Sequence, residues 1–448
     1  MTPPPPPSRP SGRWKFAFFL LALFTFRFLF GLVCPPILTG EDEVQTYVIG
    51  LKCYTTHTWP YFGPDVQGLD TTFKTQIPGA LEGLLIALPL KVLAIPESPI
   101  LFLNLLSLLA FSFLAWYCCR RLPGLSPWFV YSWVLIAPWS LHYSTQVINP
   151  SYAVLGSIVF FIGFLETLEG MGSRVLRPEW ANALMGFGFL WVYQLHMSWV
   201  LLGPYLAYSL WTQGRRGSWV LPAIAMGGGA LPMVMLLVPT LLRYGFTSGH
   251  DVHGVLTGIN WRNVRMFPDV AGRFLSFASF EVPRFIGLGM AERKAFLLRH
   301  WVLGVPGMIL WAAGILQPLG MIGIALIRVR SGGERWKTIT GVALGTLLLV
   351  WASFWFTVKD CRAHTFYITM PIAMVFSFYC WDYLASSKGW RLVAKVFLAT
   401  ALFFQVGYGI AAYRDRQGVY QQERENIRRA IQADDYRLLA ERRPQTFY

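Results

Sequence analysis

The chain has 448 residues, of which 54% are hydrophobic, 16% are aromatic and only 14% are charged. Soluble domains carry roughly a quarter charged residues, so this composition excludes an ordinary soluble protein and indicates a polytopic helical membrane protein. The net charge of +15 does not indicate a nucleic-acid partner, because basic residues gather in the cytoplasmic loops of membrane proteins.

The N-terminal region predicts a disordered cytoplasmic segment followed by a membrane anchor. Residues 1–15 contain a proline run and three basic residues, a composition typical of disorder. Residues 16–38 are almost wholly apolar and longer than a signal-peptide core, so we expect an uncleaved signal anchor. The acids Asp42 and Glu43 follow, at the expected membrane–water boundary. Such acids belong either to a catalytic site or to an ordinary solvated loop.

The rest of the chain predicts ten further crossings, giving an all-α bundle of about 11 transmembrane helices. Residues 78–95 are apolar but contain two prolines, a glutamate and a lysine, so we expect them to lie along the interface or to re-enter. Residues 413–448 predict a polar, partly helical tail. The crossings are expected at 100–118, 127–147, 151–168, 181–211 (two short helices, interrupted at 194–196), 219–241, 301–327, 339–357, 366–385 and 393–412.

The short basic loops set the predicted orientation. If residues 78–95 do not cross, every short basic loop falls on the cytoplasmic side, as the positive-inside rule requires. The N-terminus is then cytoplasmic, the C-terminus is extracytoplasmic, and the cell (inner) membrane is the expected location. Three segments share the outer face: residues 39–77, 242–300 and 358–365. We expect chemistry there, because the cytoplasmic loops are too short to build a site. The basic residues of those loops are Arg120, Arg121, Arg174, Arg177, Arg215, Arg216, Arg328, Arg330, Arg335, Lys337, Lys388 and Arg391.

The first two outer segments combine acids, aromatics and basic residues. A loop carboxylate such as Asp42 is suited to deprotonate an acceptor hydroxyl, or to hold a divalent cation through oxygen ligands. We expect interfacial helices in both segments. In the long segment the expected helix is at residues 267–286, which mix apolar residues with sparse charges. Further residues that we expect to line a cavity or meet an acceptor are Tyr47, Asp65, Asp70, His196, Arg262 and Arg265. Turn formation by the aspartates and a helix-end role for His196 are the structural alternatives.

The third outer segment is short and cationic. It carries Lys359, Arg362 and His364, although basic residues are disfavoured on the outer side. An anionic ligand would offset these charges, and lysine and arginine suit phosphate oxygens. Lys74 is placed to reach the same phosphate, with a snorkelling lysine as the alternative. Contact with lipid headgroups or with Asp360 is the alternative for the segment as a whole.

Taken in order, these motifs resemble the integral-membrane glycosyltransferases of the C-type fold. The resemblance covers residues 15–412. Within this fold, the chain most resembles the branch of bacterial protein mannosyltransferase and aminoarabinose transferase-like proteins (glycosyltransferase family 39-like). The motifs are the acids after the first helix, the Gln76-Ile77-Pro78-Gly79-Ala80-Leu81 segment, Asn149-Pro150-Ser151, and Arg362-Ala363-His364. The family often has Pro-Pro-Leu where this chain has Ile77-Pro78-Gly79.

The resemblance implies transfer of a sugar from a polyprenyl-phosphate donor to a glycan, lipid or protein acceptor on the extracytoplasmic face. Asp42 would be the base, with Glu43 beside it. Arg362, with Lys359 and His364, would hold the lipid phosphate. No cofactor is certain; a divalent cation, on Asp42 if anywhere, stays open.

Two rival functions and one disulfide are also open. A lipid or polysaccharide transporter or flippase would line a path with similar charges, although we find no internal repeat of the kind that transporters show. An O-antigen polymerase or ligase would differ only in its acceptor. Cys53 and Cys361 both fall on the predicted outer face, so an oxidising compartment would allow a disulfide between them.

Overall fold

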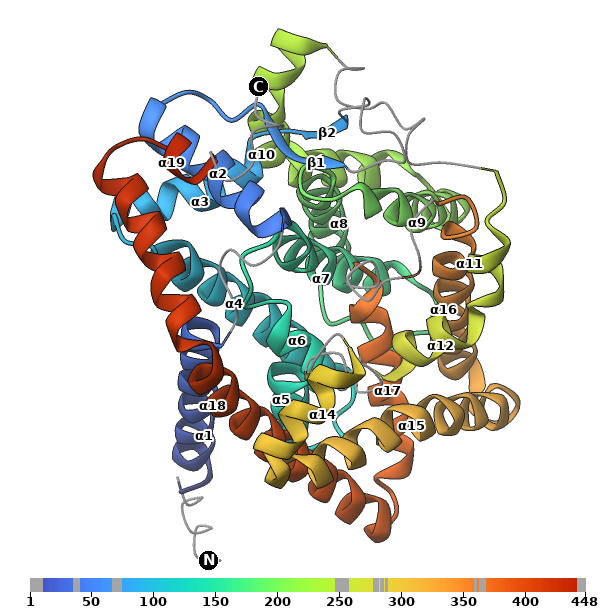
Figure 1. Ribbon diagram of the computed structural model, residues 1–448. Helices are drawn as coiled ribbons and strands as arrows, with labels where there is room; N and C mark the ends of the chain where they lie inside the picture. Colours follow the sequence, from blue (N-terminus) through green and yellow to red (C-terminus); the bar gives the residue numbers. More distant parts are fainter. Residues whose placement is uncertain are drawn as a thin grey trace, which may run out of the picture.

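The computed structural model describes residues 11–34, 41–66, 75–245, 258–276, 282, 286, 289–357, 361 and 368–440. Figure 1 shows a helical molecule with one pair of short strands. The helices are α1 (Ser11–Val33), α2 (Glu41–Thr56), α3 (Leu81–Val92), α4 (Ser98–Arg121), α5 (Pro127–Ile136), α6 (Pro138–His142), α7 (Asn149–Thr167), α8 (Pro178–Tyr193), α9 (Gly203–Arg216), α10 (Val220–Tyr244), α11 (Trp261–Arg265), α12 (Phe267–Ser276), α14 (Met290–Arg299), α15 (Gly304–Ser331), α16 (Gly333–Ser353), α17 (Met370–Leu384), α18 (Lys388–Gln432) and α19 (Arg437–Ala440), with 3-10 turns η1 (Met197–Leu202) and η3 (Trp301–Leu303).

Seven of the described helices are long and apolar enough to cross a membrane, which confirms the predicted all-α polytopic class. They are the helices that begin the chain (α1), α4, α7, α10, α15, α16 and α18. Each of the 11 predicted crossings corresponds to a helix. However, α5, α8, α9 and α17 have 10, 16, 14 and 15 residues, so at 1.5 Å per residue they are shorter than a ~30 Å hydrocarbon core. The count of 11 crossings therefore stays a prediction.

Prolines and polar residues decide where the shorter helices end. The expected break in 181–211 is confirmed: α8 ends at Tyr193 and α9 begins at Gly203. The predicted helix over 127–147 was wrong in length, because α5 ends at Ile136. Ala137 is extended (ψ 140°), as expected for a residue before proline, and Pro138 starts the separate helix α6.

The described parts of residues 39–77, the first segment predicted to lie outside, contain regular structure. The segment contains helix α2, in line with the interfacial helix expected there, and strand β1 (Phe62–Val66), which pairs antiparallel with β2 (Thr75–Pro78). The strand pair was not predicted. Helix α3 follows with 12 residues, about 18 Å, which is too short to cross. Because the side chains of α3 are largely buried, it packs inside the protein against α2.

Helix α7 lies at the centre of the core, with nearly all of its apolar window buried. It packs against α8, which in turn packs against α10. Small residues let these helices approach: a Cβ on Gly188 would lie 2.4 Å from the Gly156 carbonyl oxygen. At one end of α7, Arg121 of α4 and Glu166 form a buried ion pair 2.5 Å long. Such a pair specifies the α4–α7 arrangement, since either charge alone would be costly to bury.

The C-terminal helix α18 has 45 residues and runs without a break through the predicted boundary at residue 412. It passes beside α1 and continues to α19, which contacts α2 (Figure 1). The expected surface helix is therefore only partly exposed: Ile427 and Ile431 are buried, whereas Leu438 is exposed. The start of α1 also differs from expectation, because the helix begins at Ser11 within the segment predicted to be disordered.

Candidate functional site

The predicted outer segments contact one another or neighbouring helix ends. Thr240 of α10 donates to the Tyr61 carbonyl oxygen (2.8 Å), which joins the first segment to the C-terminal end of α10. Asn263 of α11 donates to the Phe354 carbonyl oxygen (2.9 Å) near the end of α16. Arg273 of α12 donates to the carbonyl oxygen of Cys361 in the third segment. The long segment therefore contacts the third one, and the first packs against the end of α10; a shared outer face for all three stays a prediction.

The basic loops predicted to be cytoplasmic also contact one another. Arg121 donates to the carbonyl oxygens of Met171 and Ser173 at 2.7 and 2.9 Å. Arg335 donates to the Arg121 carbonyl oxygen, and Arg216 pairs with Glu169. These contacts bring together the basic loops that follow α4, α7, α9 and α15, and the side of the membrane on which they lie stays a prediction. We call the end that carries α2, the strand pair and the C-terminal end of α10 the acid end.

The acids after α1 lie in the first turn of α2. Asp42 is exposed, whereas Glu43 is only 8% exposed and accepts a hydrogen bond from the Gln146 side chain. The pKa of Glu43 is raised to about 6, chiefly by burial and in part by the neighbouring Asp42 charge, while hydrogen bonds from its own backbone N–H and from Gln146 oppose the shift. The two adjacent carboxyls therefore have different environments: one open to solvent, one held within the protein.

A third acid lies beside them. Glu82, in the first turn of α3, is fully buried, and Thr46 of α2 donates to its Oε1 at 2.7 Å. Among the described residues its Oε2 has no hydrogen-bond partner. Burial raises the pKa of Glu82 to about 8, and the Asp42 charge adds to the shift. Sequence reasoning treated Glu82 only as a break in an apolar segment. The sequence did contain a signal for Glu82: it falls in the first turn of the helix that starts after Pro78-Gly79.

The strand pair is fixed to α10 and to the α8–η1 break. Arg243 donates to the Tyr61 hydroxyl (3.1 Å) and lies over its ring (5.0 Å). The Gly79 N–H donates to the Tyr61 carbonyl oxygen at 2.9 Å. Gly79 has φ +121°, and a Cβ there would lie 2.5 Å from the Gln194 side chain, so only glycine fits this turn. The Pro-Gly lead into α3 thus positions Glu82 through a backbone constraint.

The tail closes the other side of the acid end. Arg424 of α18 forms an ion pair with Glu97 (3.1 Å) and donates to the Leu32 carbonyl oxygen at the end of α1. Tyr420 donates its hydroxyl to the Cys34 carbonyl oxygen. Glu423 lies close enough to raise the pKa of Glu43 slightly. Sequence analysis assigned none of these tail residues to the site, because contacts across nearly 400 residues leave no local pattern.

The residues predicted to line a cavity lie in different environments in the structure. Tyr47 is fully buried and donates to the Pro96 carbonyl oxygen (3.3 Å), so it packs inside the protein. Asp65 lies in strand β1 rather than in a turn, and its carboxylate accepts from Gln76 (2.8 Å) across the strand pair. His196 caps η1 by accepting from the Ser198 N–H (3.1 Å), which agrees with its helix-end alternative. Arg262 and Arg265 are exposed on α11. The predictions for Asp70, Lys74, Lys359, Arg362 and His364 lie outside the described residues.

The disulfide and the metal site are not formed by the described residues. Cys53 and Cys361 are both buried thiols rather than a disulfide, so that hypothesis was wrong. The reason is their packing: Cys53 is on α2 and Cys361 contacts α12, and these helices lie on different sides of the molecule (Figure 1). Within the described ranges no group of three His, Cys, Asp or Glu side chains is arranged to hold a metal ion. A cation at Asp42 stays an open prediction.

A cavity of about 1150 Å³ lies at the opposite end of α7, among the basic loops. Its lining includes Glu169 and Arg215 and contains none of the predicted site residues. A second cavity of about 250 Å³ lies between α14 and α18. The acids therefore mark a candidate site by their burial and charge rather than by either of these cavities.

No protein-family model matches the chain, and no curated protein matches it. Solved structures are similar to it at low identity. ArnT from Cupriavidus metallidurans bound to undecaprenyl phosphate is 14% identical, with a TM-score of 0.45 over 90% of this chain and 76% of that chain. The apo state of the same protein gives 15% and 0.47 over the same shares. Arabinosyltransferase EmbB from Mycobacterium smegmatis is 13% identical, with a TM-score of 0.39 over 99% of this chain and 43% of that chain.

Proposed function

We propose that this protein is a membrane glycosyltransferase. It transfers a sugar from a polyprenyl-phosphate donor to an acceptor on the extracytoplasmic face, using the carboxyls at the start of α2. The observation that carries the proposal is Glu43: a buried carboxyl with a pKa raised to about 6, beside the exposed Asp42, directly after a membrane-crossing helix. A structural ion pair would lower the pKa of such a group instead.

The raised pKa suits Glu43 to general-base catalysis. A base works best with a pKa near the working pH, and at pH 7 Glu43 is mostly ionised yet still accepts a proton. Asp42, with its open access to solvent, orients the acceptor hydroxyl. In the transfer step the hydroxyl gives its proton to Glu43, its oxygen bonds to the sugar anomeric carbon, and the bond from that carbon to the phosphate oxygen breaks. The lipid phosphate leaves with the bonding electrons.

Cationic residues are required to stabilise the departing phosphate. We assign this role to Lys359, Arg362 and His364, with Lys74, because of their charge and their place in the predicted outer segments. The contact of Arg273 with Cys361 supports a fixed position for the middle of that segment. Arg243, exposed beside Tyr61 and Tyr244, adds a cation and two aromatic rings at the acid end. Aromatic faces of this kind suit stacking on a sugar ring.

The test uses the full-length protein in liposomes with a radiolabelled polyprenyl-phosphate sugar and native membrane extract as acceptor. Glu43→Gln removes the base without changing its shape, so transfer should fall by about 10²–10⁴-fold. Asp42→Asn should also reduce it. The matched control is Glu425→Gln, which alters a partly exposed carboxylate of α18 that pairs with Arg428.

Two results would count against the assignment. Wild-type transfer in both Glu43→Gln and Asp42→Asn would exclude the acid pair from catalysis. Movement of intact labelled lipid across the bilayer, with no cleavage of the donor, would support the transporter instead.

A further inference from the structure

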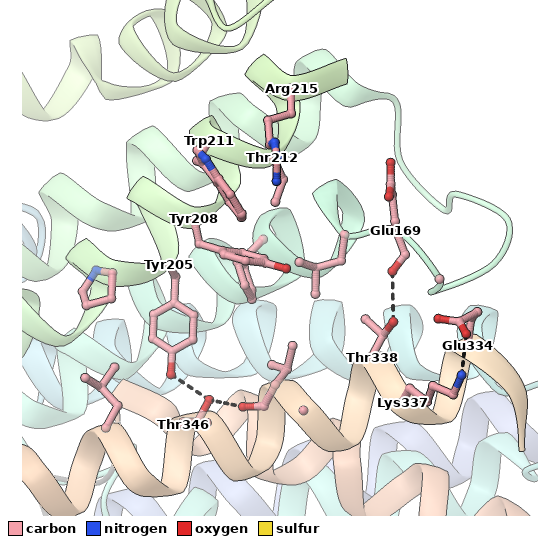
Figure 2. Close-up of a pocket in the computed structure, with 18 of the residues that line it drawn as sticks. Glu169, Tyr205, Tyr208, Trp211, Thr212, Arg215, Glu334, Lys337, Thr338 and Thr346 are labelled. Carbon is pink, nitrogen blue, oxygen red and sulfur yellow. Dashed lines mark hydrogen bonds and ion pairs between the residues drawn. The ribbon is translucent and has the colours of Figure 1, made fainter. Parts of the chain in front are cut away.

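The cavity at the end opposite the acids is a groove between two antiparallel helices. Its walls are α9 and α16, and the C-terminal end of α7 closes one side (Figure 2). We call it the α9–α16 groove; its volume is about 1150 Å³. Gln146, which contacts Glu43, lies just before α7, whereas Glu169 of the groove lies just after it. The length of α7 therefore separates the Glu169 end of the groove from the acids by roughly 27 Å.

Each wall of the groove has a charged end and an apolar end, and the like ends of the two walls lie together. The lining residues of α9 run from Pro204 and Tyr205 to Arg215 and Arg216, and those of α16 run from Glu334 and Lys337 to Leu349. These positions recur at helical spacing, so each set forms one stripe. Because the helices are antiparallel, the charged ends of the two stripes meet, and so do the apolar ends. The α16 stripe is about 22 Å long, more than the thickness of one membrane leaflet.

The charged end of the groove carries more cations than anions. Arg216 pairs with Glu169, and Lys337 pairs with Glu334 at 2.7 Å. Arg215 lies over the ring of Trp211 (4.9 Å), and no carboxylate among the described residues pairs with it. One positive charge is therefore left over at the mouth of the groove.

The other end of the groove is apolar and open. A Cβ on Gly341 or Gly345 would meet nothing within 4 Å, so the face of α16 is hollow along this stripe. Tyr205 donates to Thr346 (2.7 Å) and bridges the two helices at depth (Figure 2). Tyr208 and Trp211 are about half exposed, as expected for aromatics at a membrane–water boundary.

We propose that the α9–α16 groove binds a phospholipid with an anionic headgroup, at the end of the protein opposite the transferase site. The headgroup phosphate lies at Arg215, where the unmatched positive charge complements it, and an acyl chain follows the hollow stripe past Gly341 and Gly345. A zwitterionic lipid carries a positive group in its own headgroup, so its electrostatic attraction to Arg215 is weaker. Free phosphate has no chain to occupy the apolar half. The site is separate from donor binding and adds a lipid requirement to the fold.

The experiment measures binding of phosphatidylglycerol and phosphatidylcholine to the delipidated full-length protein by native mass spectrometry. Phosphatidylglycerol should be retained in preference to phosphatidylcholine. Arg215→Gln should weaken its binding about fivefold, the effect of removing one cation near an anionic lipid. The matched control is Arg120→Gln, which removes another exposed arginine that lies over a tryptophan, Trp116, at the end of α4.

A second variant tests the apolar half without touching a charge. Gly345→Leu places a side chain in open space within the groove, so it should fold normally and lose phosphatidylglycerol. Equal retention of the two lipids, or equal effects of Arg215→Gln and Arg120→Gln, would overturn the proposal. Displacement of the lipid by excess inorganic phosphate would do so as well, because it would show a free-phosphate site.

Discussion

Glu82→Gln should stabilise the protein, and the gain should grow with pH. Glu82 is fully buried in the first turn of α3, where burial raises its pKa from 4.5 to about 8. Glutamine keeps the shape and the acceptor oxygen for Thr46 but carries no charge. The variant therefore removes the cost of ionising a buried carboxyl while it retains the packing.

The sign follows from proton binding. Between pH 4.5 and 8 the folded state holds a proton on Glu82 that the unfolded state has released, so wild-type stability falls as pH rises. From these two pKa values, the loss relative to low pH is about 1 kcal/mol at pH 5, about 3 kcal/mol at pH 7 and about 5 kcal/mol at pH 9. Glu82→Gln should lack this dependence.

The assay is equilibrium unfolding of the purified protein in detergent at pH 5, 7 and 9. The control is Glu179→Gln, which changes an exposed carboxylate in the first turn of α8 and should track the wild type at each pH. A constant difference between Glu82→Gln and wild type across the three pH values would refute the burial argument.

Three further outcomes are expected. Gly229→Ala should lower the free energy of unfolding by about 1–3 kcal/mol, because its Cβ would lie 2.0 Å from a backbone oxygen of α8. Gly228→Ala has open space around the new Cβ, so it should leave the free energy of unfolding unchanged or raise it by up to about 1 kcal/mol. Equal melting temperatures for the two variants would contradict this. Arg424→Gln should release the tail and raise its hydrogen exchange, at about 1–3 kcal/mol, while Arg428→Gln, which loses only a surface pair, should stay within about 1 kcal/mol. The transfer rate should fall about tenfold per pH unit below pH 6, as Glu43 takes up a proton, and a flat profile from pH 4.5 to 7 would exclude it as the base.

The sequence was sufficient to select Asp42 and Glu43 as candidate catalytic acids, but not to decide which of them is suited to be the base. The family resemblance made Asp42 the base, and chain position could not separate two carboxyls that follow the same helix. The structure buries Glu43 against Gln146 and leaves Asp42 exposed, and this burial raises the pKa of Glu43 to about 6. Burial depends on residues about 100 positions away, so no local pattern encodes it.

Composition and periodicity were sufficient for the membrane class, because hydrophobicity acts residue by residue against the bilayer. The break near Gln194 was equally readable, since polar residues interrupt an apolar run locally. Tertiary packing alone determined the buried Glu82, the return of α18 to the acid end and the α9–α16 groove. Each of these arises where segments distant in the chain meet, and the free energy of such meetings depends on shape and desolvation that a linear pattern does not contain.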